Sequence, residues 1–198
     1  MAHQDHLLWR LYREGDKQAL GQLAERYYRA LKHYGLKFMV DEPIIEDCIQ
    51  ELFLQLWQNR AQINETESVK HYLFKGLRNH VLQHIRFQKR VAVDEVDWEN
   101  SVAEGEDAET LLIEQESFDV LTRTIQTQLA ALPAREREAL YLRYYEDLSV
   151  SEIAEIMNVN PQSVSNFLQK ALSKLRNRWL IHVLWVICIF LPSPLLRR

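Results

Sequence analysis

The chain has only five glycines in 198 residues, and few stretches in which β-branched and polar residues alternate. This shortage argues against a sheet-rich fold, because tight hairpin turns favour glycine and half-buried strands need alternation with a period of two. Long segments carry apolar residues at helical spacing instead. We therefore expect an all-α protein, and the length allows one large or two small domains.

Cysteine is equally scarce. The two cysteines, Cys48 and Cys188, lie far apart, and their spacing fits neither a metal site nor a redox motif. Cys48 falls on an apolar helical stripe, so we expect a buried thiol in a reduced, cytoplasmic protein. The first residues also lack the basic segment and apolar run of a signal peptide.

The residue sets that mark catalysis are missing too. We find no nucleotide-binding loop, no Ser/His/Asp set and no pair of catalytic carboxylates in the sequence. We therefore expect neither an enzyme nor a cofactor. His80 and His84 are four residues apart and could share a helix face. No carboxylate or cysteine completes a ligand set nearby, so no metal site is expected.

Charges of one sign are absent from two parts of the chain. Residues 91–122 contain eleven acids but no Lys or Arg, and no acid follows Glu155. The net charge of −4 hides this segregation, because the remaining 17 acids are outnumbered by 24 Lys and Arg. Two basic-leaning regions around an acidic centre fit a nucleic-acid-binding protein.

Residues 151–174 have the pattern of a helix-turn-helix. A short helix around Ile153 is broken at residues 158–160, and Pro161 suits the first turn of a second helix. The outer face of the second helix carries small hydrogen-bonding side chains and a cation, which suit base edges and phosphates in a major groove. These residues are Gln162, Ser163, Ser165, Asn166, Gln169 and Lys170. The alternative is an ordinary helical hairpin with a polar outer face.

The N-terminal half contains four segments with helical periodicity. The first ends near Gly15, and the second covers about residues 18–40 with a bend near Gly35. The third begins at Pro43 and carries a broad apolar stripe. Leu54 falls among acids and amides on the opposite face, so we expect it to be exposed, which hints at a protein-docking surface. The alternative is a solvated helix face.

The fourth segment, residues 69–90, combines positive charge with aromatic rings. Its six cations are Lys70, Lys75, Arg78, Arg86, Lys89 and Arg90, and it has no acid. Interleaved with them are His71, Tyr72, Phe74, His80, His84 and Phe87. Cations contact phosphates, and aromatic faces stack on unpaired bases. The alternative is a basic surface helix with core aromatics.

Three segments resemble the bacterial RNA polymerase sigma factors. DCIQELFLQLW, residues 47–57, is similar to the helix of conserved region 2, and residues 69–86 resemble the promoter-melting segment that follows it. Residues 132–176 resemble region 4. The lack of any other sizeable domain points to the compact extracytoplasmic-function (ECF) group.

The resemblance implies two small helical domains joined by an acidic linker. Region 2 would occupy residues 5–90, the linker 91–110 and region 4 residues 111–178, followed by an apolar tail at 179–198. The simplest interpretation of the acidic linker is a solvated spacer. The tail's apolar run is thirteen residues long, which as a helix gives about 20 Å against the roughly 30 Å of a bilayer core. We expect it to pack on the protein or a partner, with a weak membrane contact as the alternative.

The resemblance also implies roles for individual residues. The face that docks on the polymerase clamp helices would comprise Asp47, Gln50, Glu51 and Phe53, with Leu54 beside them. The opened −10 element would be bound by Lys75, Arg78, Asn79, Arg86, Lys89 and Arg90. The −35 element would be bound by Gln162, Ser163, Ser165, Asn166 and Lys170. The loop at residues 64–68 lies where the family captures a flipped base.

The sequence therefore predicts a sigma factor that binds core RNA polymerase, recognises −35 and −10 elements and helps to melt promoter DNA. Its expected partners are core polymerase, promoter DNA and an anti-sigma protein. The alternative is a stand-alone helix-turn-helix regulator that binds duplex DNA. The feature that discriminates between the sigma factor and the regulator is the presence of residues 47–57 together with residues 69–90, because a simple regulator does not need them.

Overall fold

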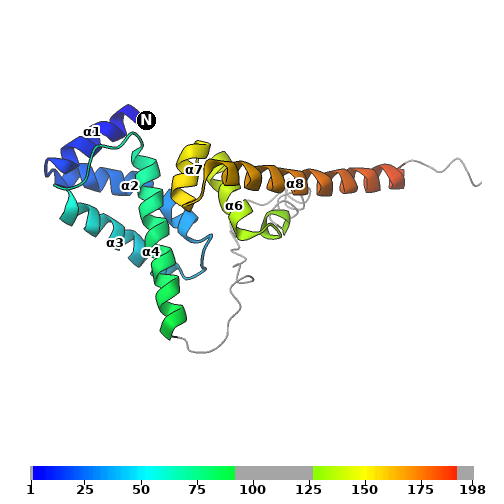
Figure 1. Cartoon of the computed structure of the whole chain (residues 1–198), viewed down its shortest axis with the longest axis horizontal. Coiled ribbons are helices and arrows are strands. Elements are labelled where there is room, and N and C mark those ends of the chain that lie inside the picture. The colour runs from blue at the N-terminus through cyan, green and yellow to red at the C-terminus, as the bar shows by residue number, and fades with distance from the viewer. Residues whose placement is uncertain (1, 92–126, 191–198) are drawn as a thin grey trace, which may run out of the picture. The chain divides into compact units, whose positions relative to one another are not determined.

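The computed structural model describes residues 2–91 and 127–190 (Figure 1). Every regular element in these ranges is a helix, and the all-α prediction is confirmed. The chain divides into two compact units, residues 1–109 with 151–158, and residues 110–150 with 159–198. The predicted acidic linker lies outside the described residues, apart from Val91 at the end of a helix.

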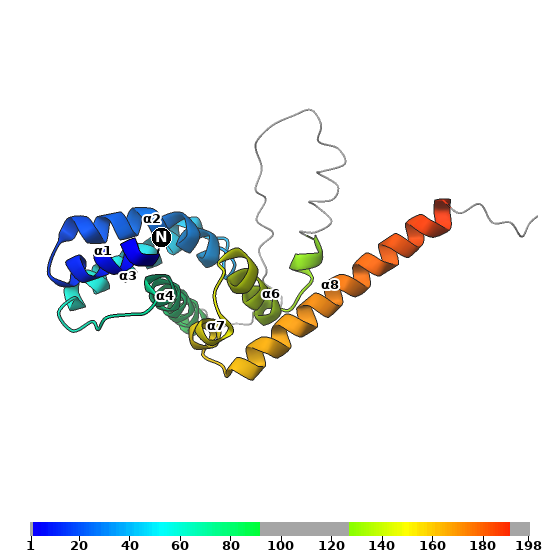
Figure 2. The ribbon, with the colours of Figure 1, turned by 90° about the horizontal axis from the view of Figure 1, so that it is seen from above.

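Four helices build most of the first unit, and Figure 2 shows them gathered together. They are α1 (Ala2–Arg13), α2 (Lys17–Gly35), α3 (Glu42–Asn59) and α4 (Val69–Val91). Residues 151–158, which include most of α7 (Val150–Met157), group with this unit. The helices meet in one apolar core, to which α2, α3 and α4 each contribute fully buried side chains.

Short polar side chains fix where the helices begin. Asp16 accepts hydrogen bonds from the backbone N–H groups of Gln18 and Ala19, at 2.8 and 3.3 Å, and so caps α2. Asp41 caps α3 in the same way through the N–H of Ile44. These caps satisfy backbone donors that have no partner inside the helix. Gly15, with φ of 105°, provides the left-handed residue in the turn before Asp16.

The second helix is shorter than the sequence pattern predicts. α2 ends at Gly35 rather than continuing to Val40, and the N–H of Phe38 bonds to the carbonyl of Gly35 in a turn. The expected bend at Gly35 is also wrong. A Cβ on Gly35 would lie 2.5 Å from Cγ2 of the buried Ile45, so glycine is required there for close packing between α2 and α3.

Helix α1 is held to its neighbours by buried polar groups. Asp5 is 6% exposed and accepts hydrogen bonds from Arg26 and from the hydroxyl of Tyr27, both on α2. The hydroxyl of Tyr12 donates to the carbonyl of Leu56 on α3 at 2.6 Å. Burial raises the pKa of Tyr12, so this hydroxyl keeps its proton and remains a donor well above neutral pH.

The second unit contains α6 (Ala134–Leu140), a π-helical turn η1 (Tyr141–Tyr145) and α8 (Pro161–Phe190). Its core joins α6 and α8 through Leu132, Leu140 and Ala171, with Leu129, Leu168 and Leu175 packed against them. Glu136 is 6% exposed and pairs with the ammonium group of Lys174 at 2.9 Å. This pair compensates for the burial of a carboxylate on α6.

The predicted recognition helix and the start of the predicted tail form one helix. α8 runs for 30 residues without a break and ends at Phe190, as the long rod in Figure 1 shows. Residues 191–198 of the predicted tail lie outside the described residues. Among the helices that the structure describes, none is long and apolar enough to cross a membrane.

Two glycines of α2 provide a matched test of the packing. Gly35→Ala should lower the free energy of unfolding by about 1–3 kcal/mol, because Ile45 is β-branched and buried and cannot turn aside easily. Gly21→Ala, which meets nothing within 4 Å, should raise it by about 0.5–1 kcal/mol through helix propensity. Urea denaturation measures both. Equal stabilisation by both substitutions would contradict the close approach at Gly35.

Candidate nucleic-acid interface

The outer face of α3 presents acids, amides and one apolar side chain to solvent. Asp47, Gln50 and Glu51 are exposed, and Leu54 is 56% exposed, which confirms the expectation for Leu54. Phe53 is half-buried at the edge of the same face. The opposite face of α3 is buried, so the helix separates its core stripe cleanly from its outer surface.

Two of the acids on α3 are tied to neighbouring helices. Glu46 accepts hydrogen bonds from Lys32 and Tyr28 of α2, both at 2.9 Å, and these bonds lower the pKa of Glu46. Glu51 lies 3.5 Å from Nδ1 of His80 on α4, but its side chain remains 66% exposed. Glu51 is therefore the more accessible of the two for a cationic partner.

The residues predicted to bind the −10 element lie on α4 with different exposure. Arg86 and Asn79 are exposed, whereas Lys75 and Arg78 are half-buried. The ammonium group of Lys75 is 3.3 Å from the carboxylate of Glu155 on α7, in an ion pair between exposed groups. Such a pair contributes about 0–1 kcal/mol, so a phosphate can compete for Lys75. The side chains of Lys89 and Arg90 lie outside the described residues.

The aromatic residues of α4 divide between core and surface. Phe74 is fully buried, with its ring centroid 5.0 Å from that of Tyr34 on α2. The stacking interpretation is therefore wrong for Phe74, which belongs to the core. Phe87 is 65% exposed, one position after Arg86, and keeps its ring accessible.

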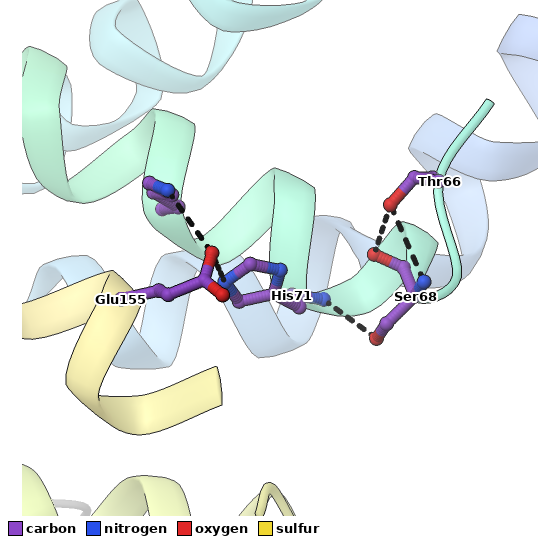
Figure 3. Close-up of polar contacts among 5 residues, drawn as sticks. Thr66, Ser68, His71 and Glu155 are labelled. Carbon is purple, nitrogen blue, oxygen red and sulfur yellow. Dashed lines mark hydrogen bonds and ion pairs between the residues drawn. The ribbon is translucent and has the colours of Figure 1, made fainter. Parts of the chain in front are cut away.

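The loop between α3 and α4 is closed by local hydrogen bonds at its C-terminal end, as Figure 3 shows. The hydroxyl of Thr66 donates to the carbonyl of Ser68, and the N–H of Ser68 donates back to the Thr66 hydroxyl oxygen. The Ser68 hydroxyl accepts from the N–H of His71 and caps α4. Glu155 also approaches the ring of His71, whose pKa is lowered by burial.

The start of α8 presents the side chains expected of a recognition helix. Asn160 caps it by accepting from the N–H of Ser163 at 2.7 Å, two residues after Asn158 with its φ of 53°. Val164 and Ala171 are fully buried. The predicted −35 residues lie on the other face: Gln162, Ser165, Asn166 and Lys170 are exposed and Ser163 is half-buried. The amide of Gln162 donates to the side-chain oxygen of Asn166 at 3.2 Å.

Comparison with known protein families gives two matches. The model of sigma-70 region 2 matches residues 23–91, and the model of sigma-70 region 4 matches residues 122–175. These two matches cover most of the chain, in the order that the sequence predicts. The chain belongs to the sigma-70 family of RNA polymerase sigma factors. Sigma factors are DNA-binding transcription initiation factors and are not known as enzymes.

Relatives of similar length support this family. The chain is 24% identical over 175 residues to the ECF RNA polymerase sigma factor SigW of Bacillus subtilis, covering 84% of this chain and 91% of SigW. It is 24% identical over 183 residues to the ECF sigma-E factor of Escherichia coli, covering 88% and 93%. The alignments therefore cover nearly the whole length of both relatives.

Solved structures share the fold of this sigma factor. CnrH, in complex with the cytosolic domain of CnrY, aligns with a TM-score of 0.60 at 19% identity, covering 89% of this chain and 97% of CnrH. RpoE of Bartonella quintana, in complex with the anti-sigma factor NepR, aligns with a TM-score of 0.58 at 20% identity, covering 79% and 94%.

The division of aromatic residues on α4 can be tested by two matched substitutions. Phe74→Ala should lower the free energy of unfolding by about 3–5 kcal/mol, because it leaves a cavity against Tyr34. Phe87→Ala on the same helix should change it by less than about 0.5 kcal/mol, because its ring is largely exposed. Chemical denaturation followed by circular dichroism measures both, and a similar loss in the two variants would contradict the assignment.

Proposed function

We propose that α3, α4 and α8 divide the work of this sigma factor among three contacts. The observation that carries the proposal is the presence of both sigma regions in one chain. A stand-alone regulator needs a duplex-binding helix, but it has no use for a second region with an acidic docking face and a basic helix. The second region therefore favours the sigma-factor mechanism.

Helix α3 is the proposed docking surface for core polymerase. Its exposed acids and Leu54 form a face in which an apolar side chain is surrounded by charge, a composition that suits a protein partner. Glu51 would attract a cationic group on the polymerase clamp, and Leu54 would bury its side chain against the partner. Phe53, half-buried beside them, would complete the edge of this contact.

Helix α4 is the proposed contact with the opened −10 element. Melting costs on the order of 1.4 kcal/mol for each base-pair step. Stacking of an unpaired base on a protein surface returns about 1–3 kcal/mol, and cations hold the strand by its phosphates. Arg86 and Asn79 are exposed for this role, and Lys75 and Arg78 are half-exposed. Binding energy alone would thus favour the open strand, without covalent chemistry.

The start of α8 is the proposed reader of the −35 duplex. Amide groups such as those of Gln162 and Asn166 can form paired hydrogen bonds with base edges in the major groove. Lys170 lies further along the exposed face and can contact a phosphate, and Ser163 and Ser165 can bond to either. The Gln162–Asn166 hydrogen bond would hold both amides in a defined orientation before DNA binds.

An anti-sigma protein is the proposed regulator of this chain. In the solved structures described above, CnrH is in complex with the cytosolic domain of CnrY, and the sigma factor RpoE is in complex with the anti-sigma factor NepR. A bound protein that covers α3 or α4 would compete directly with polymerase or DNA. We place the protein in the cytoplasm, where it would meet core polymerase and chromosomal DNA.

The overall function is tested by reconstitution. Core RNA polymerase with the purified protein should give discrete run-off transcripts from some genomic fragments, whereas core polymerase alone should give none at those sites. The protein should also co-purify with core polymerase. Specific binding to duplex DNA without core polymerase, together with no promoter-dependent transcript, would favour the stand-alone regulator instead.

The docking role of α3 predicts a charge-dependent loss of polymerase binding. Glu51→Lys should weaken the affinity for core polymerase about tenfold or more, because it places a like charge against a cationic partner. The same reversal at Glu25, exposed on α2, is the matched control and should leave the affinity unchanged. Titration against labelled core enzyme measures both, with circular dichroism to verify folding. Equal affinities would reject the proposed docking surface.

The two DNA contacts predict two different losses. Gln162→Ala or Asn166→Ala should relax the preference for −35 sequences by about 1–3 kcal/mol, because base-edge contacts carry specificity. Arg86→Ala should weaken promoter opening on every sequence and reduce the salt dependence by about one phosphate contact. Competition binding measures the first, and permanganate footprinting at several salt concentrations measures the second. Normal promoter opening by the Arg86 variant would count against its role.

A further inference from the structure

Helix α1 makes polar contacts that reach the loop between α3 and α4, residues 60–68. The family match to region 2 begins at residue 23, so α1 lies outside it, and the sequence motifs assign α1 no role. Its contacts with the loop span fifty or more residues of sequence. They are all inside the first unit, where α1 packs directly against α2 and α4.

Two α1 side chains bond to consecutive backbone carbonyls in the middle of the loop. Nε of Arg13 donates to the carbonyl of Ile63 at 2.7 Å, and Nε1 of Trp9 donates to the carbonyl of Asn64 at 3.3 Å. A terminal nitrogen of Arg13 also lies 3.5 Å from the carboxylate of Glu65. Three consecutive loop residues are therefore attached to one helix.

The loop's own hydrogen bonds are placed at its ends. At its beginning, the N–H groups of Gln62 and Ile63 donate to the carbonyl of Asn59. At its end, Thr66 and Ser68 bond to each other. The described bonds on the carbonyls between these two turns come from Trp9 and Arg13. The position of the loop's centre thus depends on α1.

Trp9 is rigidly held and suits the role of a fixed support. It is only 2% exposed, and its ring lies 5.0 Å from that of Tyr72 on α4 and 5.2 Å from that of Tyr12. A side chain locked by packing positions its hydrogen-bond donor within narrow limits, as supporting residues of binding sites do. Arg13, part-exposed, adds a second anchor one turn further along α1.

A cleft of about 280 Å³ lies where α1 meets the loop. One wall is formed by α1 and the other by Glu65 and Thr66 of the loop, while His6 and Arg10 add polar groups from α1. Because Trp9 lines the cleft and also bonds to the loop, it links the two walls. Any movement of the loop away from α1 would change the width of the cleft.

We propose that Trp9 and Arg13 are positioning residues for base selection: they hold the loop at residues 60–68 against α1, so that it receives one unpaired base of the opened −10 strand in a fixed geometry. This inference rests on the proposed function of α4 at the −10 element and on the flipped-base role that the sigma-factor resemblance implies for the loop. A loop of nine residues without these anchors would sample many conformations, and ordering it would oppose binding. Anchoring the loop in advance makes the difference between a fitting and a misfitting base larger.

The test removes the donors and preserves the packing. Trp9→Phe eliminates the indole N–H but keeps an aromatic ring against Tyr72, and Arg13→Met eliminates the guanidinium but keeps an unbranched chain. Arg13→Lys retains a donor and should restore part of the effect. Arg29→Met, on the exposed face of α2, is the matched control. Each variant is assembled with core polymerase and offered fork-junction DNA whose single-stranded −10 segment is randomised.

Two readouts separate positioning from a general structural role. Sequencing of the retained DNA gives the base preference at each position of the single strand. In the variants, this preference should fall about three- to tenfold at one or two adjacent positions only, because the loss of one hydrogen bond changes a binding constant by about that factor. Hydrogen exchange of the peptide covering residues 59–68 should accelerate by a similar factor. The base preference at all other positions and the affinity for core polymerase should equal those of the unmodified protein. The Arg29→Met control should match the unmodified protein in every readout.

The possible failures are distinguishable. If the unmodified protein shows no base preference in the single strand, the proposed −10 function itself fails, and the positioning role with it. If the unmodified protein selects bases but the variants bind all sequences more weakly with the same preference, α1 only stabilises the fold. If the loop's hydrogen exchange does not change, Trp9 and Arg13 do not hold it, and the inference is overturned.

Discussion

The close approach of α3 to its two neighbours is the constraint on which the first unit depends. Glycine allows it on both sides: a Cβ on Gly35 of α2 would meet Ile45 at 2.5 Å, and a Cβ on Gly76 of α4 would meet Leu52 at 2.6 Å. With both neighbours so close, the apolar stripe of α3 is fully used by the core. The acids, amides and Leu54 then have no place except the outer surface, where a partner can reach them.

The sequence predicts most of the helices because their start signals are local. Asp16, Asp41 and Ser68 each precede a helix and cap it, and a pattern of apolar residues follows each one. The end of α2 is less predictable, because apolar residues continue through Leu36 and Phe38 beyond the last helical turn. At Gly35 the helix lies so close to Ile45 that a Cβ would be 2.5 Å from its Cγ2, and this tertiary contact is not visible in the sequence pattern.

The difference between local sequence signals and tertiary contacts also explains which parts of the candidate site can be predicted from the sequence. The exposed face at the start of α8 and Leu54 on α3 follow from helical periodicity alone. Phe74 could not be assigned in this way, because it borders both the apolar stripe and the basic face, and only the ring of Tyr34 decides for the core. Trp9 and Arg13 carry no sequence signal for their contacts with Asn64 and Ile63, which lie 55 and 50 residues further along the chain.

The proposed contacts with polymerase and DNA differ in how much the rest of the structure must do to hold their residues in place. Side chains on α3, α4 and α8 are oriented by the helices themselves, since the buried face of each helix fixes the direction of its exposed face. A loop has no such internal frame, and the carbonyls at the centre of this one are bonded by side chains from outside it. Here α1 provides two donors, one from a buried indole and one from a guanidinium. A base-selecting loop would therefore need a helix that does not itself have to touch DNA, which gives a physical reason for α1 to precede the region that carries the family motifs.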